Sequence, residues 1–156
     1  MTEKVQAAFE QLQTTFKTGK TKTLEWRRNK LRALEKGMKE MTAEISAAVS
    51  KDHRRKEAEV FGSEIGPMIE AIRHVDSNLE SYMADIPEKA ELILAPATCS
   101  VRYEPLGVVG VYGSWNFPVL LAVKPVIYAI AAGNCVLLKP SEVSKNASAV
   151  VKRMFD

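Results

Sequence analysis

Residues 104–148, EPLGVVGVYGSWNFPVLLAVKPVIYAIAAGNCVLLKPSEVSKNAS, decide the fold of this chain. The apolar runs Val108–Tyr112 and Asn134–Leu138 are typical of parallel strands that are buried on both faces. Between them, Pro118 marks a helix start and Gly133 provides a left-handed stop. Strand, helix and strand joined by short turns predict a βαβ unit, whose crossover is almost always right-handed.

Upstream of Pro87, apolar residues are spaced by threes and fours, which is the spacing of a helix with one buried face. We expect one helix over residues 2–16 and a second, long helix over residues 24–51. A third helix is predicted to open at Ser63 or Gly66 and to end before Pro87.

The period of the apolar pattern changes after the third helix. Short strands are predicted at residues 92–94 and 99–103, and Pro96 between them indicates an edge hairpin or an arm. Beyond the βαβ unit, Ser144 or Asn146 would cap a further helix.

The charge of the chain is mild and unevenly spread. The formal net charge is +3; residues 1–60 carry 14 Lys and Arg against 9 Asp and Glu, and residues 61–156 carry 8 against 10. The basic clusters Arg27–Lys30 and Arg54–Lys56 stand beside acidic residues, as on a solvated helix face. Phosphate binders need clustered, unneutralised cations, so we expect no nucleic-acid partner.

The cysteines and histidines do not form a recognisable metal or nucleophile motif. Cys99 and Cys135 lie in apolar, strand-like sequence without metal-ligand spacing, which favours free thiols in a reducing compartment. His53 and His74 lack ligand partners four residues away, so they are predicted to be surface or structural histidines. No metal site is expected.

No targeting or membrane segment is predicted. Residues 1–13 are amphipathic and carry acidic side chains, unlike a secretory or transit peptide, so a cytoplasmic location is expected. The longest nearly uncharged run, residues 105–138, contains Lys124 and is broken by prolines, as expected for a buried α/β core.

Two polar turns follow the two buried strands, Trp115–Pro118 after the first and Lys139–Glu142 after the second. Both leave the carboxyl ends of parallel strands, where open α/β sheets bind ligands. The Asn116 amide is a good donor to a developing oxyanion. Lys139 and Glu142 suit two adjacent hydroxyls, since one donates and the other accepts. The alternative is that Asn116 caps the next helix and that Lys139 and Glu142 are an ordinary surface pair.

The segment from Glu104 to Asn146 closely resembles the start of the nucleotide-binding domain of the aldehyde dehydrogenases, especially the class 3 branch for fatty and aromatic aldehydes. The resemblance implies that Asn116 stabilises the oxyanion of a cysteine thiohemiacetal. It implies that Lys139 and Glu142 hold the adenine ribose of NAD or NADP. The residues it places along the cofactor cleft are Tyr112, Gly113, Ser114 and Trp115.

The resemblance also implies the overall organisation of the chain, an α/β fold that corresponds to the first third of a family member. Residues 1–86 would form an N-terminal helical region, residues 87–104 a β-arm, and residues 105–156 the first βαβ unit of a Rossmann-like domain. For the whole enzyme it implies an aldehyde substrate and a homodimer. The family's nucleophilic cysteine and general-base glutamate lie beyond the part that is matched, so we expect the isolated chain to be inactive.

Three interpretations therefore stay open. The chain can be an N-terminal piece of an NAD(P)-dependent aldehyde dehydrogenase. It can be a non-catalytic short isoform that binds or regulates full-length subunits through its arm and helices. It can also be a helical interaction protein whose βαβ unit is only structural, in which case Lys139→Ala and Glu142→Ala would change no nucleotide affinity. Neither the aldehyde chain length nor the choice of NAD over NADP follows from the sequence.

Overall fold

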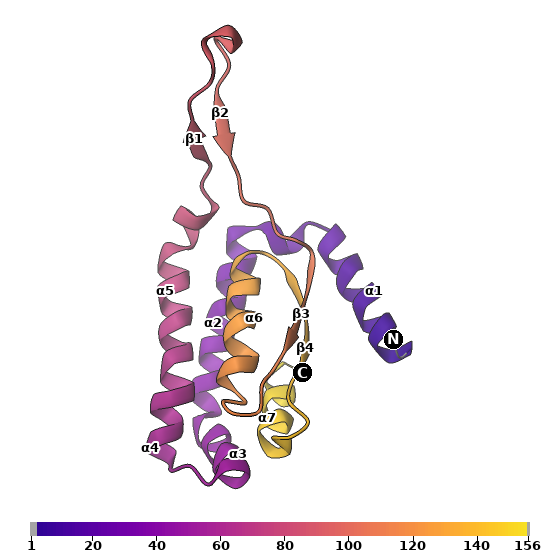
Figure 1. Cartoon of the computed structure of the whole chain (residues 1–156), viewed down its shortest axis with the longest axis vertical. Helices are drawn as coiled ribbons and strands as arrows, with labels where there is room; N and C mark the ends of the chain where they lie inside the picture. Colours follow the sequence, from indigo (N-terminus) through magenta and orange to yellow (C-terminus); the bar gives the residue numbers. More distant parts are fainter. Residues whose placement is uncertain (1–2, 156) are drawn as a thin grey trace.

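The computed structural model describes residues 3–155, in which a body of helices and a short parallel sheet carries a projecting arm (Figure 1). The first half contains α1 (Glu3–Lys17), α2 (Leu24–Glu40), α3 (Thr42–His53), α4 (Glu57–Val60) and α5 (Gly66–Met83). The arm contains β1 (Ile86–Glu88) and β2 (Cys99–Val101). The second half contains β3 (Val108–Tyr112), α6 (Leu120–Ala131), β4 (Cys135–Lys139) and α7 (Lys145–Phe155). This is the α/β arrangement that the sequence predicts.

The βαβ unit is confirmed. β3 and β4 pair in parallel, from Val108 opposite Cys135 to Tyr112 opposite Lys139, and α6 connects them. Gly133 ends the helical segment with a φ of 88°, a left-handed conformation that glycine adopts without steric cost. Both strands therefore end at the same edge of the sheet.

One hydrophobic core joins the helical half to the βαβ unit. α6 lies between the sheet and the pair α2 and α5, while α1 lies on the other side of the sheet (Figure 1). Each large apolar side chain that is fully buried contributes roughly 1.5–3 kcal/mol relative to an exposed one. Those on α2, α3, α5 and α6 include Leu31, Met38, Ile45, Ile72, Leu79, Val123 and Ile127.

The prediction of one long helix over residues 24–51 is wrong in one respect, because the chain bends at Met41. Met41 has φ −93° and ψ 5° and separates α2 from α3. The Thr42 hydroxyl donates to the Met38 carbonyl at 3.0 Å, a side-chain contact that tends to bend helices. The bend brings α3 against α7, so that the apolar face of α3 is buried there.

The third helix begins at one of its two predicted positions but continues a helical segment that starts earlier. α5 opens at Gly66, yet the chain is already helical from Glu57 through α4 and through a π-helical turn, Phe61–Ile65. π-helical turns are rare and occur often at functional sites. This one buries the charged side chain of Glu64 completely.

The arm is an antiparallel hairpin, as the sequence suggests, and the strand predicted at residues 99–103 is confirmed over Cys99–Val101, but its partner strand differs from the one expected. Ile86–Glu88 pairs with Cys99–Val101, and the predicted strand at residues 92–94 is wrong. Those residues form a 3-10 turn at the tip, in which Leu94 N–H bonds to the Glu91 carbonyl at 2.9 Å. A chain that reverses direction there satisfies its backbone locally instead of by strand pairing.

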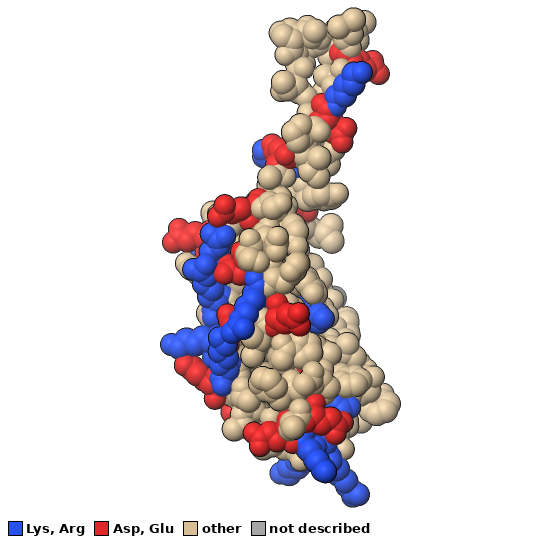
Figure 2. Space-filling view, turned by 90° about the vertical axis from the view of Figure 1, so that its left-hand side faces the viewer, with Lys and Arg blue, Asp and Glu red and all other residues tan. Residues whose placement is uncertain are grey.

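Several basic residues of the helical half form ion pairs with acidic ones. Figure 2 shows both kinds of side chain interleaved over α2 and α5. Arg28 reaches Asp76 at 3.2 Å and Arg73 reaches Glu35 at 2.7 Å. The expected solvated face is wrong for Arg27, which is buried and donates to the Ala131 carbonyl at the end of α6.

The start of α7 is capped from outside its own segment. We expected Ser144 or Asn146 to cap it, but the carboxylate of Asp52 in α3 accepts from Asn146 Nδ2 at 2.6 Å and from Ala147 N–H at 2.8 Å. Burial alone would raise the pKa of the Asp52 carboxyl. The hydrogen bonds from Ala147 and Asn146 outweigh burial and hold this pKa below its ordinary value.

Asp52→Asn is expected to lower the free energy of unfolding at pH 7 by about 1 kcal/mol, the usual worth of a negative charge at the amino end of a helix. Because the folded pKa of Asp52 is depressed, its contribution is complete above its unfolded pKa of about 3.9 and is lost as the pH falls through the lower folded pKa. Urea unfolding from pH 7 to pH 2 should show the variant and the wild type converging in acid. Glu40→Gln, at an exposed carboxylate of α2, is the control. If the difference in the free energy of unfolding between the variant and the wild type stayed constant down to pH 2, this would contradict the role of the ionised Asp52 carboxylate.

Candidate functional site

The two polar turns that the sequence singled out meet at one edge of the sheet. Gly113 N–H donates to the Lys139 carbonyl at 2.8 Å, directly after the last paired residues of β3 and β4. A Cβ on Gly113 would lie 3.0 Å from the Ala122 Cβ and 3.4 Å from the Pro140 Cα. Glycine therefore allows the two turns and the start of α6 to approach this closely.

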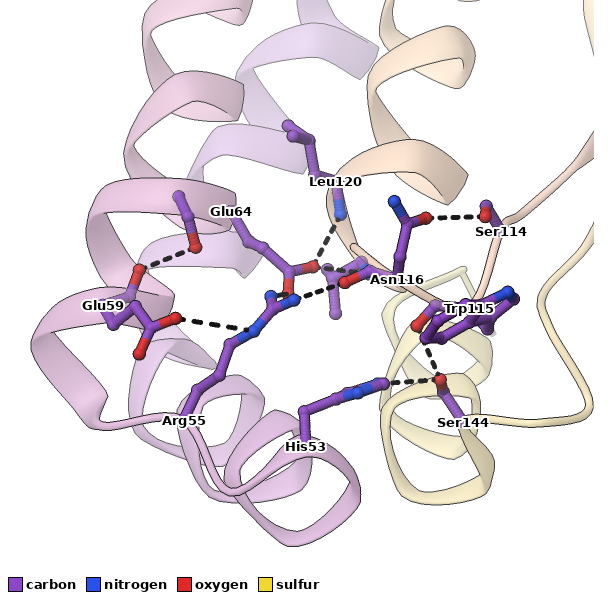
Figure 3. A network of polar contacts seen from close by, with 11 residues as sticks. His53, Arg55, Glu59, Glu64, Ser114, Trp115, Asn116, Leu120 and Ser144 are labelled. Carbon is purple, nitrogen blue, oxygen red and sulfur yellow. Dashed lines mark hydrogen bonds and ion pairs between the residues drawn. The ribbon is translucent and has the colours of Figure 1, made fainter.

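The Asn116 side chain is held with its amide nitrogen available. The Ser114 hydroxyl donates to Asn116 Oδ1 at 2.7 Å, and the close-up in Figure 3 shows this contact on the first turn. Within residues 3–155, Asn116 Nδ2 makes no hydrogen bond. In this arrangement Oδ1 accepts from the Ser114 hydroxyl, and Nδ2 is the end of the amide that is left to donate.

The amino end of α6 is closed by Glu64 and not by Asn116. Glu64 Oε2 accepts from Val119 N–H at 2.8 Å and from Leu120 N–H at 3.1 Å. The interpretation of Asn116 as the cap of this helix is therefore wrong. The positive end of the helix dipole faces a carboxylate that already neutralises it.

Arg55 joins this carboxylate to the turn. Arg55 Nη1 lies 2.9 Å from Glu64 Oε1, and Nη2 donates to the Asn116 carbonyl. The guanidinium also lies over the Phe117 ring, 4.5 Å from its centre. Its side chain is 16% exposed, so the solvated face predicted for the cluster 54–56 is wrong at Arg55.

A second link reaches the same turn from α3. The Ser144 hydroxyl donates to the Trp115 carbonyl at 3.0 Å and lies 2.9 Å from His53 Nε2. Because Ser144 has a single proton, His53 Nε2–H must be the donor in the contact between them. His53 is thus a structural histidine, as expected.

The second turn places two opposite charges side by side. Lys139 Nζ and Glu142 Oε2 form an ion pair, and both side chains are exposed, by 57% and 76%. The hydrogen bond from Lys139 lowers the pKa of the Glu142 carboxyl below its ordinary value. Tyr112 and Trp115 are exposed at the same edge. The structure therefore brings the seven predicted site residues together.

The sequence patterns did not predict that Arg55 and Glu64 belong to the site. They are nine residues apart, so no helical pairing rule connects them. The one available signal is a single carboxylate, Glu64, among apolar and small residues in VFGSEIG, residues 60–66. A lone charge in such a context is buried only when it has partners.

The described part of the chain offers no metal site and no activated thiol. Across residues 3–155, no group of three His, Cys, Asp or Glu side chains could hold a metal ion. Burial raises the pKa of the Cys135 thiol, which disfavours the reactive thiolate. Cys99 lies on the arm, in β2.

Comparison with known proteins gives a consistent result. All of residues 1–156 match the model described as the aldehyde dehydrogenase family. The chain is 38% identical over 146 residues to aldehyde dehydrogenase family 3 member I1, chloroplastic, of Arabidopsis thaliana, covering 94% of this chain and 26% of the relative. It is 33% identical to the dimeric NADP-preferring aldehyde dehydrogenase of Canis lupus familiaris, covering 92% and 32%. The chain thus spans about a quarter to a third of these relatives.

Solved structures agree with the relatives. The substrate-bound state of Staphylococcus aureus AldH superposes with a TM-score of 0.94 at 30% identity, covering 96% of this chain and 33% of that one. The NADP complex of glyceraldehyde-3-phosphate dehydrogenase GapN from Methanocaldococcus jannaschii gives 0.68 at 21% identity, covering 98% and 34%, and shows a shared fold alone.

Proposed function

The chain belongs to the aldehyde dehydrogenase family, and we propose that it supplies the oxyanion donor and the cofactor-ribose contacts of an enzyme that oxidises an aldehyde to a carboxylic acid with NAD or NADP. The observation that carries this proposal is the fixed amide of Asn116. Its Oδ1 is held by Ser114 and its main-chain carbonyl by Arg55, while Nδ2 is left to donate.

Asn116 would act when a cysteine thiolate of the enzyme adds to the aldehyde carbonyl. The carbonyl oxygen then becomes negatively charged, and a hydrogen bond from Nδ2 strengthens as this charge develops. Because Ser114 already orients the amide, little reorganisation is needed at that moment. A carboxamide does not titrate, so this contribution is independent of pH.

The second turn fits the ribose of the cofactor. When bound, NAD or NADP accepts the hydride. The Lys139 ammonium can donate to one ribose hydroxyl, and the ionised Glu142 carboxylate can accept from its neighbour. Gly113 lets the two turns pack closely together, and the exposed Tyr112 and Trp115 rings would line the cleft. A relative that is named NADP-preferring supports the cofactor class.

Neither cysteine of the described residues suits the role of nucleophile. Cys135 is buried with a raised pKa, and Cys99 belongs to the arm. We therefore expect the nucleophilic cysteine and the general-base glutamate of the reaction to come from outside residues 3–155. Residues 1–156 on their own should show no dehydrogenase turnover, and measurable turnover by them would contradict this.

The arm favours a second role as a subunit contact. Leu92, Ile93 and Tyr103 are 91%, 87% and 75% exposed, which is unusual for large apolar side chains. We infer that the arm packs against a second copy in a homodimer, or against a full-length subunit if a short form is made. Leu92→Asp with Ile93→Asp should shift sedimentation from dimer towards monomer. An unchanged dimer would rule out the arm as the contact.

We also infer a cytoplasmic location. Both cysteines are free thiols, in keeping with a reducing compartment. In residues 3–155, no helix is long and apolar enough to cross a membrane. Recovery of the protein in an organelle fraction would contradict this inference.

Asn116→Ala is expected to lower kcat of the full-length enzyme about 10²- to 10³-fold, the usual loss when one oxyanion donor is removed. The affinity for NAD or NADP should stay unchanged, because the ribose contacts are on the other turn. Steady-state kinetics and cofactor titration of the same variant test both parts. A kcat within about twofold of the wild type would remove the oxyanion role, since such a loss is far below that of any oxyanion donor.

Lys139→Ala and Glu142→Ala are each expected to weaken NAD or NADP binding about tenfold or more, since each removes a hydrogen bond to a charged group. At saturating cofactor, kcat should change little. Lys36→Ala is the matched control, because Lys36 forms a similarly exposed ion pair with Glu40 on α2. Equal cofactor affinity in all of these variants would favour a merely structural βαβ unit.

A further inference from the structure

Two side chains from the helical half of the chain form hydrogen bonds to the turn that carries Asn116. Glu64 binds the N–H groups of Val119 and Leu120, and Arg55 binds the Asn116 carbonyl and covers the Phe117 ring. Figure 3 shows the two side chains entering from the same side, between the helices and the turn. Together they contact both ends of residues 116–120.

Every oxygen of the buried carboxylate has a partner. Oε1 of Glu64 pairs with Arg55 Nη1 at 2.9 Å, and Oε2 accepts from the N–H groups of Val119 and Leu120. Glu64 is 0% exposed, so loss of Arg55 would leave a buried charge without its counter-ion. A buried ion pair is often no more stabilising than well-packed apolar residues. Stability alone therefore explains little of why these two charges are here.

The positions of Arg55 and Glu64 around Asn116 give a better reason for the presence of these two charges. Asn116 is tied at its main-chain oxygen by Arg55 and at its side-chain oxygen by Ser114. These two contacts restrain Asn116 at its main chain and at its side chain. Glu64 adds a third restraint, because it fixes the first turn of α6 directly after the loop. The π-helical turn at residues 61–65 is the local feature that holds Glu64 in place.

The helix itself cannot replace the asparagine. Its free N–H groups at Val119 and Leu120 are taken by Glu64, so they are not available to a substrate oxygen. The carboxylate also cancels the positive end of the helix dipole. Asn116 Nδ2 is then a side-chain donor that this turn can still offer, and its position matters more.

We propose that Arg55 and Glu64 are positioning residues for Asn116, which set the place of its amide nitrogen in the oxyanion site. They touch neither substrate nor cofactor, and they act through the turn at residues 116–120. This inference rests on the oxyanion role proposed for Asn116.

The test is a double-mutant cycle between Arg55 and Asn116 in the full-length enzyme. Arg55→Gln should lower kcat about 10²-fold, the loss that a displacement of about 1 Å can cause. The dissociation constant of NAD or NADP should stay within about twofold, as expected for a site that is not coupled to Arg55. In the Asn116→Ala background, Arg55→Gln should lower kcat by no more than about twofold further.

Two more variants separate positioning from folding. Arg55→Lys keeps a cation that can reach Glu64 and should recover part of the lost kcat. Arg54→Gln, at the exposed neighbouring residue, should leave kcat and the cofactor affinity unchanged. If Arg55→Gln does not fold, Arg55→Lys takes its place in the cycle, with a smaller loss in kcat that must again disappear in Asn116→Ala.

The outcomes are distinct. Two results would make Arg55 a structural residue and overturn the positioning role. One is that Arg55→Gln and Arg55→Lys lower kcat by the same factor in Asn116→Ala as in the wild type. The other is that cofactor affinity and kcat fall together. The oxyanion role would survive either result. If Asn116→Ala itself leaves kcat unchanged, both proposals are overturned at once.

Discussion

The buried carboxylate of Glu64 is the contact on which the geometry of the candidate site depends. Unpartnered, it would cost several kcal/mol, so Arg55 and the first N–H groups of α6 must assemble around it. Glu64 and Arg55 belong to the helical half. Among the groups that they bind, the Val119 N–H and the Asn116 carbonyl belong to the segment between β3 and α6. The interaction that joins the two halves therefore also sets where the Asn116 turn lies.

Charged side chains of the helical half also bind other helix ends in the second half of the chain. Arg27 donates to the Ala131 carbonyl at the negative end of α6, and a Cβ on Gly133 would lie 2.6 Å from its Nη2. Asp52 accepts from the N–H groups at the positive end of α7. In each case the side-chain charge is opposite to that of the helix end. Three charged side chains of the helical half, Glu64, Arg27 and Asp52, thus fix the position of the second half of the chain, in addition to the shared apolar core.

Sequence periodicity was enough for the helices, the βαβ unit and the meeting of two polar turns, because these follow from local patterns of burial. It failed where distant contacts override a local pattern. The bend at Met41 accompanies the packing of α3 against α7, and residues 92–94 form a turn because the hairpin must reverse there. The link between Arg55 and Glu64 depends on a π-helical turn that no apolar period reveals. The turns were predictable, but the residues that hold them were not.

The most direct test of the account is a crystal structure of the full-length enzyme with NAD or NADP and an aldehyde or a carboxylate product bound. We expect Asn116 Nδ2 to lie about 3 Å from the substrate oxygen, within hydrogen-bonding distance. We also expect Lys139 and Glu142 to contact adjacent ribose hydroxyls. A cofactor bound away from the edge where β3 and β4 end, or an Asn116 amide that faces only protein groups, would contradict it.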